Sequence, residues 1–372
     1  MFLKRGLAAA LAAVTVIGLA GCGGSDDAAE ADTATVKKGF VEKKVEPANF
    51  DSGVELTSDC YRFIYALGNA PATIDAAKFF KMRLEQESKG TLSCDIYTDN
   101  VLGSERELLE GCQFGNYDIV LATNATVASF ENDIFCLDIP WLFDNKQQVY
   151  EVLDGPLGDR LADGLEDSGF KLLQWQENAF RTLSTNKPIK DMSDLKGVKI
   201  RIMENELQLQ QWKNYGANPT PMAFTELFTA LQQKTVDAQD NGAELTWQTK
   251  FYEVQSHYTY TKHIYSPYLI LMSKDKFDAL TPEQQEIVLK VSDEAVAYER
   301  QRCDEYEKVA LENIKNCGTM QYSDLDPKVK AEMVKACEGL KEMAYKKVAD
   351  PSVVDLLYDE VAKAKEKFPE EG

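Results

Sequence analysis

The sequence has few of the residues and motifs that enzymes commonly use. It contains only two histidines, His257 and His263, so the commonest general base is scarce. No nucleophile elbow, Walker loop, dinucleotide-binding glycine motif, zinc-protease helix or EF-hand loop is present. None of the cysteine spacings resembles a zinc site. We therefore expect a protein that is not an enzyme and that needs neither a cofactor nor a metal ion.

Basic residues are also in short supply. Lysine and arginine number 41 against 61 aspartate and glutamate residues, which gives a formal net charge of −20. Binding to nucleic acid is not expected, because neutralising phosphates requires a basic face. A hydrophobic content of 44% and 372 residues are typical of a globular protein with about two domains.

Long hydrophobic runs are absent except at the extreme N-terminus. There, Lys4 and Arg5 precede an apolar run at residues 6–20, which is too short for an ordinary membrane-spanning helix and is typical of a secretory signal. The run ends in Leu19-Ala20-Gly21-Cys22, which resembles a bacterial lipoprotein box; the alternative is an apolar segment that happens to end in cysteine. Cleavage after residue 21 leaves 351 residues and a charge of −22. We expect a protein outside the cytoplasm, in the periplasm or on the outer face of the cell membrane, that touches the membrane only through a lipid on Cys22.

Residues 22–50 are rich in small and charged side chains and predict a flexible tether of roughly 30 Å. Seven further cysteines follow. An odd number cannot all pair, and the one candidate disulfide joins Cys60 to Cys94, which lie near the starts of two neighbouring predicted strands. The alternative is that the thiols are buried like apolar side chains. The seven are Cys60, Cys94, Cys112, Cys136, Cys303, Cys317 and Cys337.

The body of the chain alternates between strand and helix patterns, which favours an α/β architecture with mostly parallel sheets. A capping box at Ser104 and Glu107 predicts where one helix begins. Strands are predicted at 61–66, 93–97, 117–122, 171–176, 180–185, 198–202 and 236–238, and helices at 74–88, 105–114, 207–215 and 224–233. A second capping box, Thr281-Pro282-Glu283-Gln284, starts a helix of about 34 residues and roughly 50 Å, long enough to cross two domains. Helical stretches also follow Pro327 and Pro351.

One arginine stands out in this pattern. Arg201 falls near the C-terminal end of the strand 198–202, and ligands of open α/β sheets bind beyond such strand ends. A guanidinium there matches a carboxylate through two parallel hydrogen bonds. The alternative is an exposed arginine at the end of a strand.

Six ordered blocks of sequence carry a family resemblance that covers most of the chain. The chain resembles the extracytoplasmic solute-binding proteins of tripartite ATP-independent periplasmic (TRAP) transporters, of the dicarboxylate-receptor type. The blocks are LGSERELL at 102–109, GNYD at 115–118, DLKGVKIR at 194–201, GANPTPMAF at 216–224, LQQKTVDAQDN at 231–241 and KFYEV at 250–254.

The resemblance implies a two-lobed periplasmic-binding-protein fold with a long helix bridging both domains, and closure on an organic acid that is passed to a membrane permease. Domain I would comprise residues 51–177 plus 268–307, and domain II residues 178–267 plus 308–372. In this resemblance Arg201 clamps the substrate carboxylate, and a monomer is expected. The implied substrate-binding residues are Arg201, Arg181, Asn241, Phe224, Asn69, Thr123, Asn124 and Thr126.

Two alternatives remain open at this point. The receptor could serve an ATP-driven importer or a sensor system, or the chain could be an organic-acid lyase. Gly242, Thr123 and Thr126 depart from relatives that bind sugar acids such as sialic acid, so a smaller acid or a uronate is expected.

Overall fold

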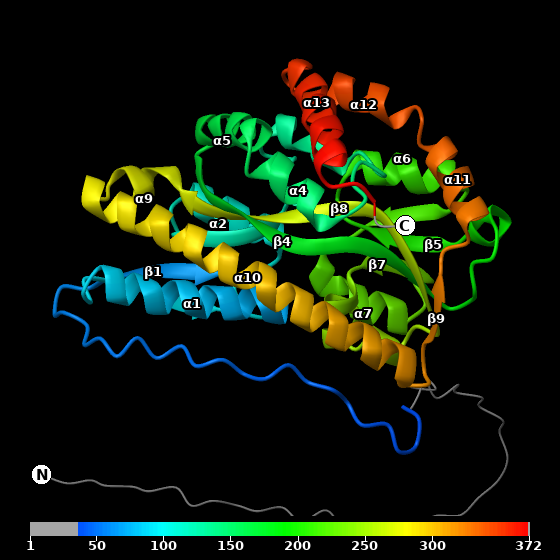
Figure 1. Ribbon diagram of the computed structural model, residues 1–372, viewed down its shortest axis with the longest axis horizontal. Helices are drawn as coiled ribbons and strands as arrows, with labels where there is room; N and C mark the ends of the chain where they lie inside the picture. The colour runs from blue at the N-terminus through cyan, green and yellow to red at the C-terminus, as the bar shows by residue number, and fades with distance from the viewer. Residues whose placement is uncertain (1–35, 371–372) are drawn as a thin grey trace, which may run out of the picture. The chain divides into compact units, whose positions relative to one another are not determined.

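The computed structural model describes residues 36–370, which contain one nine-stranded sheet with helices on both faces (Figure 1). The sheet has the order β2-β1-β3-β8-β4-β7-β5-β6, and β9 pairs with β8. The strands are β1 (Tyr61–Ala66), β2 (Leu92–Tyr97), β3 (Ile119–Thr123), β4 (Phe170–Thr185), β5 (Lys199–Ile202), β6 (Asn218–Pro221), β7 (Ala238–Asn241), β8 (His257–Ser273) and β9 (Gln321–Asp324).

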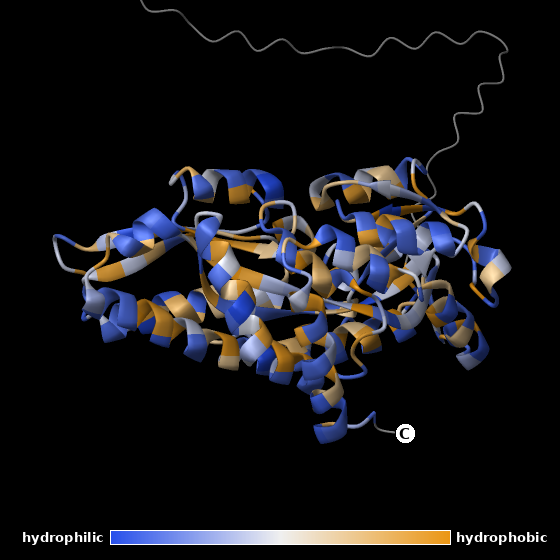
Figure 2. Ribbon diagram, turned by 90° about the horizontal axis from the view of Figure 1, so that it is seen from above, coloured by the Kyte–Doolittle hydropathy of each residue, from blue (hydrophilic) through white to orange (hydrophobic). Residues whose placement is uncertain are grey.

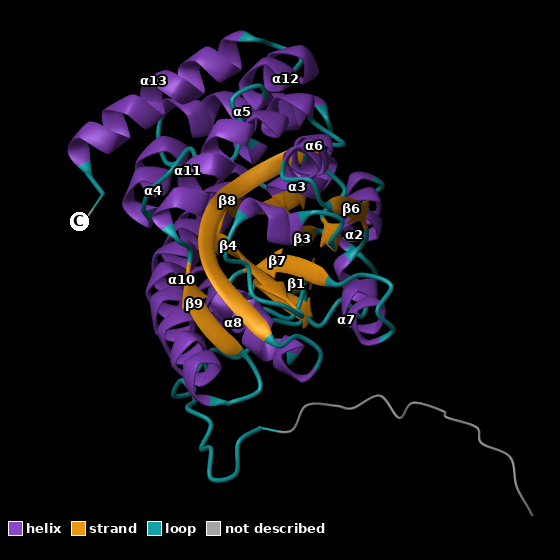
Figure 3. Ribbon diagram, turned by 90° about the vertical axis from the view of Figure 1, so that its right-hand side faces the viewer, coloured by secondary structure: helices purple, strands orange, loops and turns teal. Residues whose placement is uncertain are grey.

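Two long antiparallel strands, β4 and β8, form the centre of the sheet and hold two halves together (Figure 3). On one side β3 pairs with β8 and continues to β1 and β2 in parallel; on the other side β7 pairs with β4 and continues to β5 and β6 in parallel. We call these sides the first half and the second half. Each half is therefore parallel, as the sequence predicts, while the centre is antiparallel.

The helices pack their apolar side chains against the two faces of this sheet and against one another. They are α1 (Pro71–Glu87), α2 (Glu105–Gln113), α3 (Asn124–Val127), α4 (Lys146–Leu153), α5 (Pro156–Asp167), α6 (Glu206–Asn214), α7 (Phe224–Gln232), α8 (Ala243–Gln248), α9 (Lys274–Asp278), α10 (Pro282–Asn316), α11 (Pro327–Ala336), α12 (Leu340–Lys347) and α13 (Ser352–Lys367), with 3-10 turns η1 (Asn132–Asp138), η2 (Met192–Leu195) and η3 (Phe251–Glu253).

The alternation of side chains along β8 builds two cores. Ile270 and Met272 point into a cluster under α1 and α10, whereas Leu269 and Leu271 point into the larger cluster on the opposite face. This is the two-residue period of a strand buried on both faces. Figure 2 shows hydrophobic residues along the strands and mixed, partly hydrophilic faces on the outer helices.

The predicted long helix is confirmed as α10, of 35 residues. Its first turn carries the capping box of Thr281 and Gln284, as expected. It packs against α1, β4, α8 and β9, and so contacts elements of both halves (Figure 1). The predicted domain boundaries fall inside β4, β8 and α10 and stay predictions; in β4 the boundary coincides with a β-bulge between Gln176 and Ala179.

The described part of the expected tether differs from the prediction. Residues 37–50 run along α10 (Figure 1), where the Lys43 N–H donates to Asn313 Oδ1 at 2.9 Å and Asn313 Nδ2 donates to the Lys43 carbonyl at 2.9 Å. Trp247 Nε1 donates to Glu42 Oε1 at 2.9 Å. These partners are about 200 residues or more away in sequence, so local composition gave no sign of them. The signal and Cys22 lie outside the described residues.

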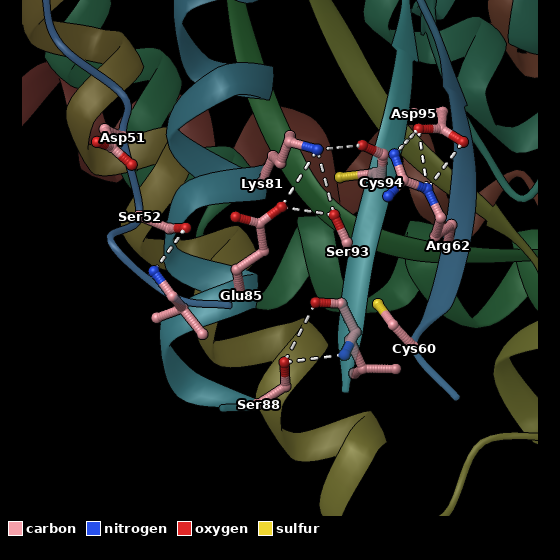
Figure 4. A network of polar contacts seen from close by, with 12 residues as sticks. Asp51, Ser52, Cys60, Arg62, Lys81, Glu85, Ser88, Ser93, Cys94 and Asp95 are labelled. Atoms are coloured by element: carbon pink, nitrogen blue, oxygen red, sulfur yellow. Dashed lines mark hydrogen bonds and ion pairs between the residues drawn. The ribbon is translucent and has the colours of Figure 1, made fainter. Parts of the chain in front are cut away.

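The candidate disulfide between Cys60 and Cys94 is wrong: the two thiols are free and stand on neighbouring strands in Figure 4. All seven cysteines of the described chain are unpaired. The register of β1 and β2 gives the reason, because Cys94 lies opposite Phe63, three residues beyond Cys60. At ~3.3 Å per residue the two cysteines are offset by ~10 Å, more than the ~7 Å between Cα atoms that a disulfide spans. Six of the seven thiols are buried, in line with the alternative interpretation.

Candidate functional site

A cavity of about 650 Å³, counting the space that opens to solvent, lies between the two halves. Its walls come from loops and helix starts after β1, β3, β5 and β7 and from the centre of β4, the strand-end position where α/β sheets bind ligands. The lining residues are Gly68, Asn69, Asn100, Ser104, Glu105, Arg106, Thr123, Thr126, Asn178, Arg181, Arg201, Met203, Glu204, Met222, Ala223, Phe224, Thr225, Asn241, Leu245 and Tyr268.

Arg201 reaches this cavity from β5. The neighbouring Ile200 and Ile202 point into the core and fix the strand, so the alternate residue between them faces the other way. The Arg201 side chain is only 3% exposed, and its Nε donates to the Met222 carbonyl at 2.9 Å. Within residues 36–370 its two terminal nitrogens have no hydrogen-bond partner and form no ion pair. Burial, reinforced by nearby Arg181, lowers the pKa of Arg201 to about 10. The alternative of an exposed arginine at a strand end is therefore excluded.

Arg181, on β4, is held from behind by a buried acidic residue. Its Nη2 donates to Asp240 Oδ1 at 2.9 Å and also to the Asp240 carbonyl. His263 Nε2 lies 2.9 Å from the other carboxylate oxygen, Oδ2. Burial favours the protonated form of Asp240, yet Arg181 and His263 keep the pKa of this carboxyl well below its usual range. Asp240 thus supplies the opposite charge for Arg181.

Asn241 and Phe224 complete the wall of the second half. Asn241 ends β7, directly across the ladder from Thr182 on β4. Phe224 begins α7, and the Arg201 guanidinium carbon lies 5.9 Å from the centre of its ring. The ring also packs edge-on against Phe251, which anchors it.

In the wall of the first half, three of the predicted substrate-binding residues, Asn69, Thr123 and Thr126, line the cavity. Asn124 does not. Its side chain is fully buried, donates to Asp138 Oδ2 at 2.9 Å and accepts from Ser266 Oγ at 2.8 Å. Asn124 was predicted to bind substrate, but at the start of α3 its side chain faces Asp138 and Ser266, so the structure does not bring it to the cavity wall with the other predicted site residues.

The sequence prediction missed Glu105, the first residue of α2. Its Oε2 accepts hydrogen bonds from the Thr123 N–H at 3.1 Å, from Thr123 Oγ1 at 2.6 Å and from Thr126 Oγ1 at 2.8 Å. The capping box at Ser104 places Glu105 at the helix start, and this was the available signal.

Arg106, the residue after Glu105, was missed as well. It forms an ion pair of 3.5 Å with Glu204, which follows β5, so this pair joins the two halves at the cavity. Both side chains are about 40% exposed. An exposed pair of this kind contributes ~0–1 kcal/mol. Asn100, Asn178, Met222 and Tyr268 are further lining residues that sequence reasoning did not find.

Two halves joined by shared strands and a long helix, with a buried arginine in the cavity between them, define the class of two-lobed bacterial solute receptors. The chain belongs to the bacterial extracellular solute-binding protein family 7, whose family model DctP matches residues 65–347. Members of this family and the structural neighbours are substrate-binding receptors rather than enzymes, and several neighbours are TRAP periplasmic solute-binding proteins, so the lyase alternative is dropped.

Individual relatives agree with this assignment. The chain is 34% identical over 274 residues to the 2,3-diketo-L-gulonate-binding periplasmic protein YiaO of Escherichia coli, covering 73% of this chain and 84% of YiaO. The sugar acid binding protein DctPAm of Advenella mimigardefordensis, in complex with galactonate, superposes with a TM-score of 0.79 at 29% identity, covering 82% of this chain and 99% of that protein. A TRAP periplasmic solute-binding protein of Xanthobacter autotrophicus with bound β-D-galacturonate superposes with a TM-score of 0.76 at 28% identity, covering 80% of this chain and 99% of that protein.

Along residues 36–370, no helix is both long and apolar enough to cross a membrane. In the same range, no group of three or more histidine, cysteine, aspartate or glutamate side chains is arranged to hold a metal ion.

Proposed function

We propose that this chain binds the carboxylate of a small organic acid in the cavity and delivers it to the membrane subunits of a TRAP transporter. The observation that carries the proposal is Arg201, a residue only 3% exposed that lines the cavity and whose two terminal nitrogens have no protein partner in the described chain. Leaving a buried guanidinium unpaired is unfavourable, whereas a carboxylate satisfies it through two charge-assisted hydrogen bonds.

Arg181, Asn241 and Phe224 support Arg201 in this proposal. Arg181, whose charge is balanced by Asp240, lines the same cavity, and its Nε has no hydrogen-bond partner within the described chain. Asn241 offers an amide with both donor and acceptor atoms, and the Phe224 ring restricts the position of the guanidinium. Asn69, Thr123 and Thr126 contact the other end of the ligand from the first half. The net charge of −20 does not oppose this, because screening beyond about 8 Å suppresses distant carboxylates.

Binding couples to closure of the two halves. The carboxylate held by Arg201 on the second half and the contacts from the first half favour the conformation in which both reach the ligand, so binding shifts the population toward it. The closed surface is what the permease recognises. The receptor acts as a monomer held at the membrane by a lipid on Cys22.

A thermal-shift screen of organic acids tests the proposal. A ligand at 100 times its dissociation constant adds about 2.7 kcal/mol of stability, which raises the melting temperature by several degrees. We expect at least one carboxylic acid to produce such a shift and its amide or alcohol analogue to produce none. Equal shifts with the acid and its neutral analogue, or no shift with any acid, would contradict carboxylate recognition.

A further inference from the structure

Some of the charged side chains that line the cavity have an ion-pair partner and others have none. Three arginines and two glutamates line it. Arg181 is paired with Asp240 and Arg106 with Glu204, as described above. Two charges remain without an ion-pair partner among residues 36–370: the cation of Arg201 in the second half and the anion of Glu105 in the first half.

Hydrogen bonds from neighbouring residues fix the carboxylate of Glu105 in place. Three donors from β3 and α3 converge on Oε2, and Oε1 receives no hydrogen bond from a described residue. Glu105 also lies in the first turn of α2, and the N-terminal end of a helix is electropositive, so a negatively charged side chain is well placed there. A ligand in the cavity therefore meets one carboxylate with hydrogen-bond capacity to spare, and an ionised carboxylate accepts only.

The two unpaired groups select opposite properties in a ligand. Arg201 favours one carboxylate. Glu105 favours hydroxyl donors and repels a second carboxylate, for which the described cavity offers no further unpaired cation. The other polar side chains facing the cavity include the amides of Asn69, Asn100 and Asn178, which can donate to or accept from hydroxyl groups.

We infer that the cavity selects monocarboxylates that carry several hydroxyl groups over dicarboxylates, and that Glu105 is the residue that determines this specificity. The inference rests on the proposed function, since it assumes that Arg201 binds the carboxylate end. Glu105 both accepts from the hydroxyl end and excludes a second negative charge.

Matched pairs of acids test this directly. An aldonate and the aldarate of the same configuration, such as galactonate and galactarate, differ only at the terminal carbon, which is a hydroxymethyl group in the aldonate and a carboxylate in the aldarate. Calorimetry on the unmodified protein should include such pairs in several configurations, together with the matching uronates and succinate. We expect the best aldonate or uronate to bind at least about tenfold more tightly than its aldarate and than succinate, because placing like charges together costs several kcal/mol.

The Glu105→Gln variant keeps the size of the side chain and removes the charge. It should weaken binding of the hydroxylated monoacid. It should also reduce the ratio of the aldarate's dissociation constant to that of the monoacid by about tenfold or more. Glu110→Gln is the matched control, since Glu110 lies on the exposed side of the same helix and does not line the cavity. It should leave the ratio unchanged.

The outcomes separate this inference from the proposed function. If the unmodified protein binds an aldarate or succinate more tightly than the hydroxylated monoacids, the inference is overturned while carboxylate binding stands. The same holds if the ratio of the two dissociation constants in Glu105→Gln stays within twofold of the original. Should Glu105→Gln fail to fold, the ratio measured on the unmodified protein still decides. Failure of every acid to bind overturns the proposed function, and this inference with it.

Discussion

Replacing Arg201 by lysine removes the two parallel hydrogen bonds to the ligand carboxylate with little change in the charge or length of the side chain. A lysine cannot present two parallel donors to a carboxylate, nor can it keep the bond from Nε to the Met222 carbonyl while reaching the ligand. Because the side chain is only 3% exposed, water does not replace the lost contacts. We expect a loss of about 2 to 5 kcal/mol in binding, the range for one member of a buried charge pair. This corresponds to roughly 30-fold to 4,000-fold in the dissociation constant.

Calorimetry with the acid that gives the largest thermal shift measures this loss. Arg62→Lys is the control, because Arg62 pairs with Asp95 on the surface of β1 and β2 (Figure 4), outside the cavity. The melting temperature of Arg201→Lys without ligand should stay close to that of the unmodified protein, since the arginine has no ion-pair partner in the described chain to lose. A Kd within about threefold of the original would show that Arg201 does not bind the carboxylate.

Two further predictions concern other parts of the chain. Burial raises the pKa of Glu244 from 4.5 to about 8, so between these values the unfolded chain loses a proton that the folded chain keeps, and stability falls as pH rises. Glu244→Gln, which can still accept from the Ala72 N–H, should gain stability relative to the unmodified protein from pH 4.5 to 8 in urea unfolding; a constant difference would contradict the shift. Cys22→Ala should move the protein from the membrane fraction to the soluble extracytoplasmic fraction, and retention in the membrane would refute lipid anchoring.

Much of the fold follows from patterns within a few residues. The capping boxes at Ser104 and Thr281 mark the starts of α2 and α10, where a side-chain oxygen and a backbone N–H only three residues away determine the geometry. β1 matches its predicted range fully. The two strands predicted at 171–176 and 180–185 are one strand, β4, because a β-bulge lets the chain continue through the polar residues between them.

Other features of the fold had no local signal. Strand β8 was not predicted, although it joins β3 and β4 and so connects the two halves of the sheet. The predicted 236–238 strand is β7 at Ala238–Asn241, shifted toward the cavity residue Asn241. Which strands pair, and in which register, depends on partners far away in the chain.

For the site, the amino-acid sequence alone determined that Arg201 lies near the end of a strand, since alternation of apolar residues and the strand position are local properties. Only the tertiary structure decided which charges remain unpaired. Asp240 lies against Arg181 and Glu204 against Arg106, whereas Arg201 and Glu105 face the cavity without an ion-pair partner in the described chain. The reason is physical: an ion pair depends on separations of a few ångströms between groups that lie about 60 to 100 residues apart, and only packing of the complete chain sets those separations.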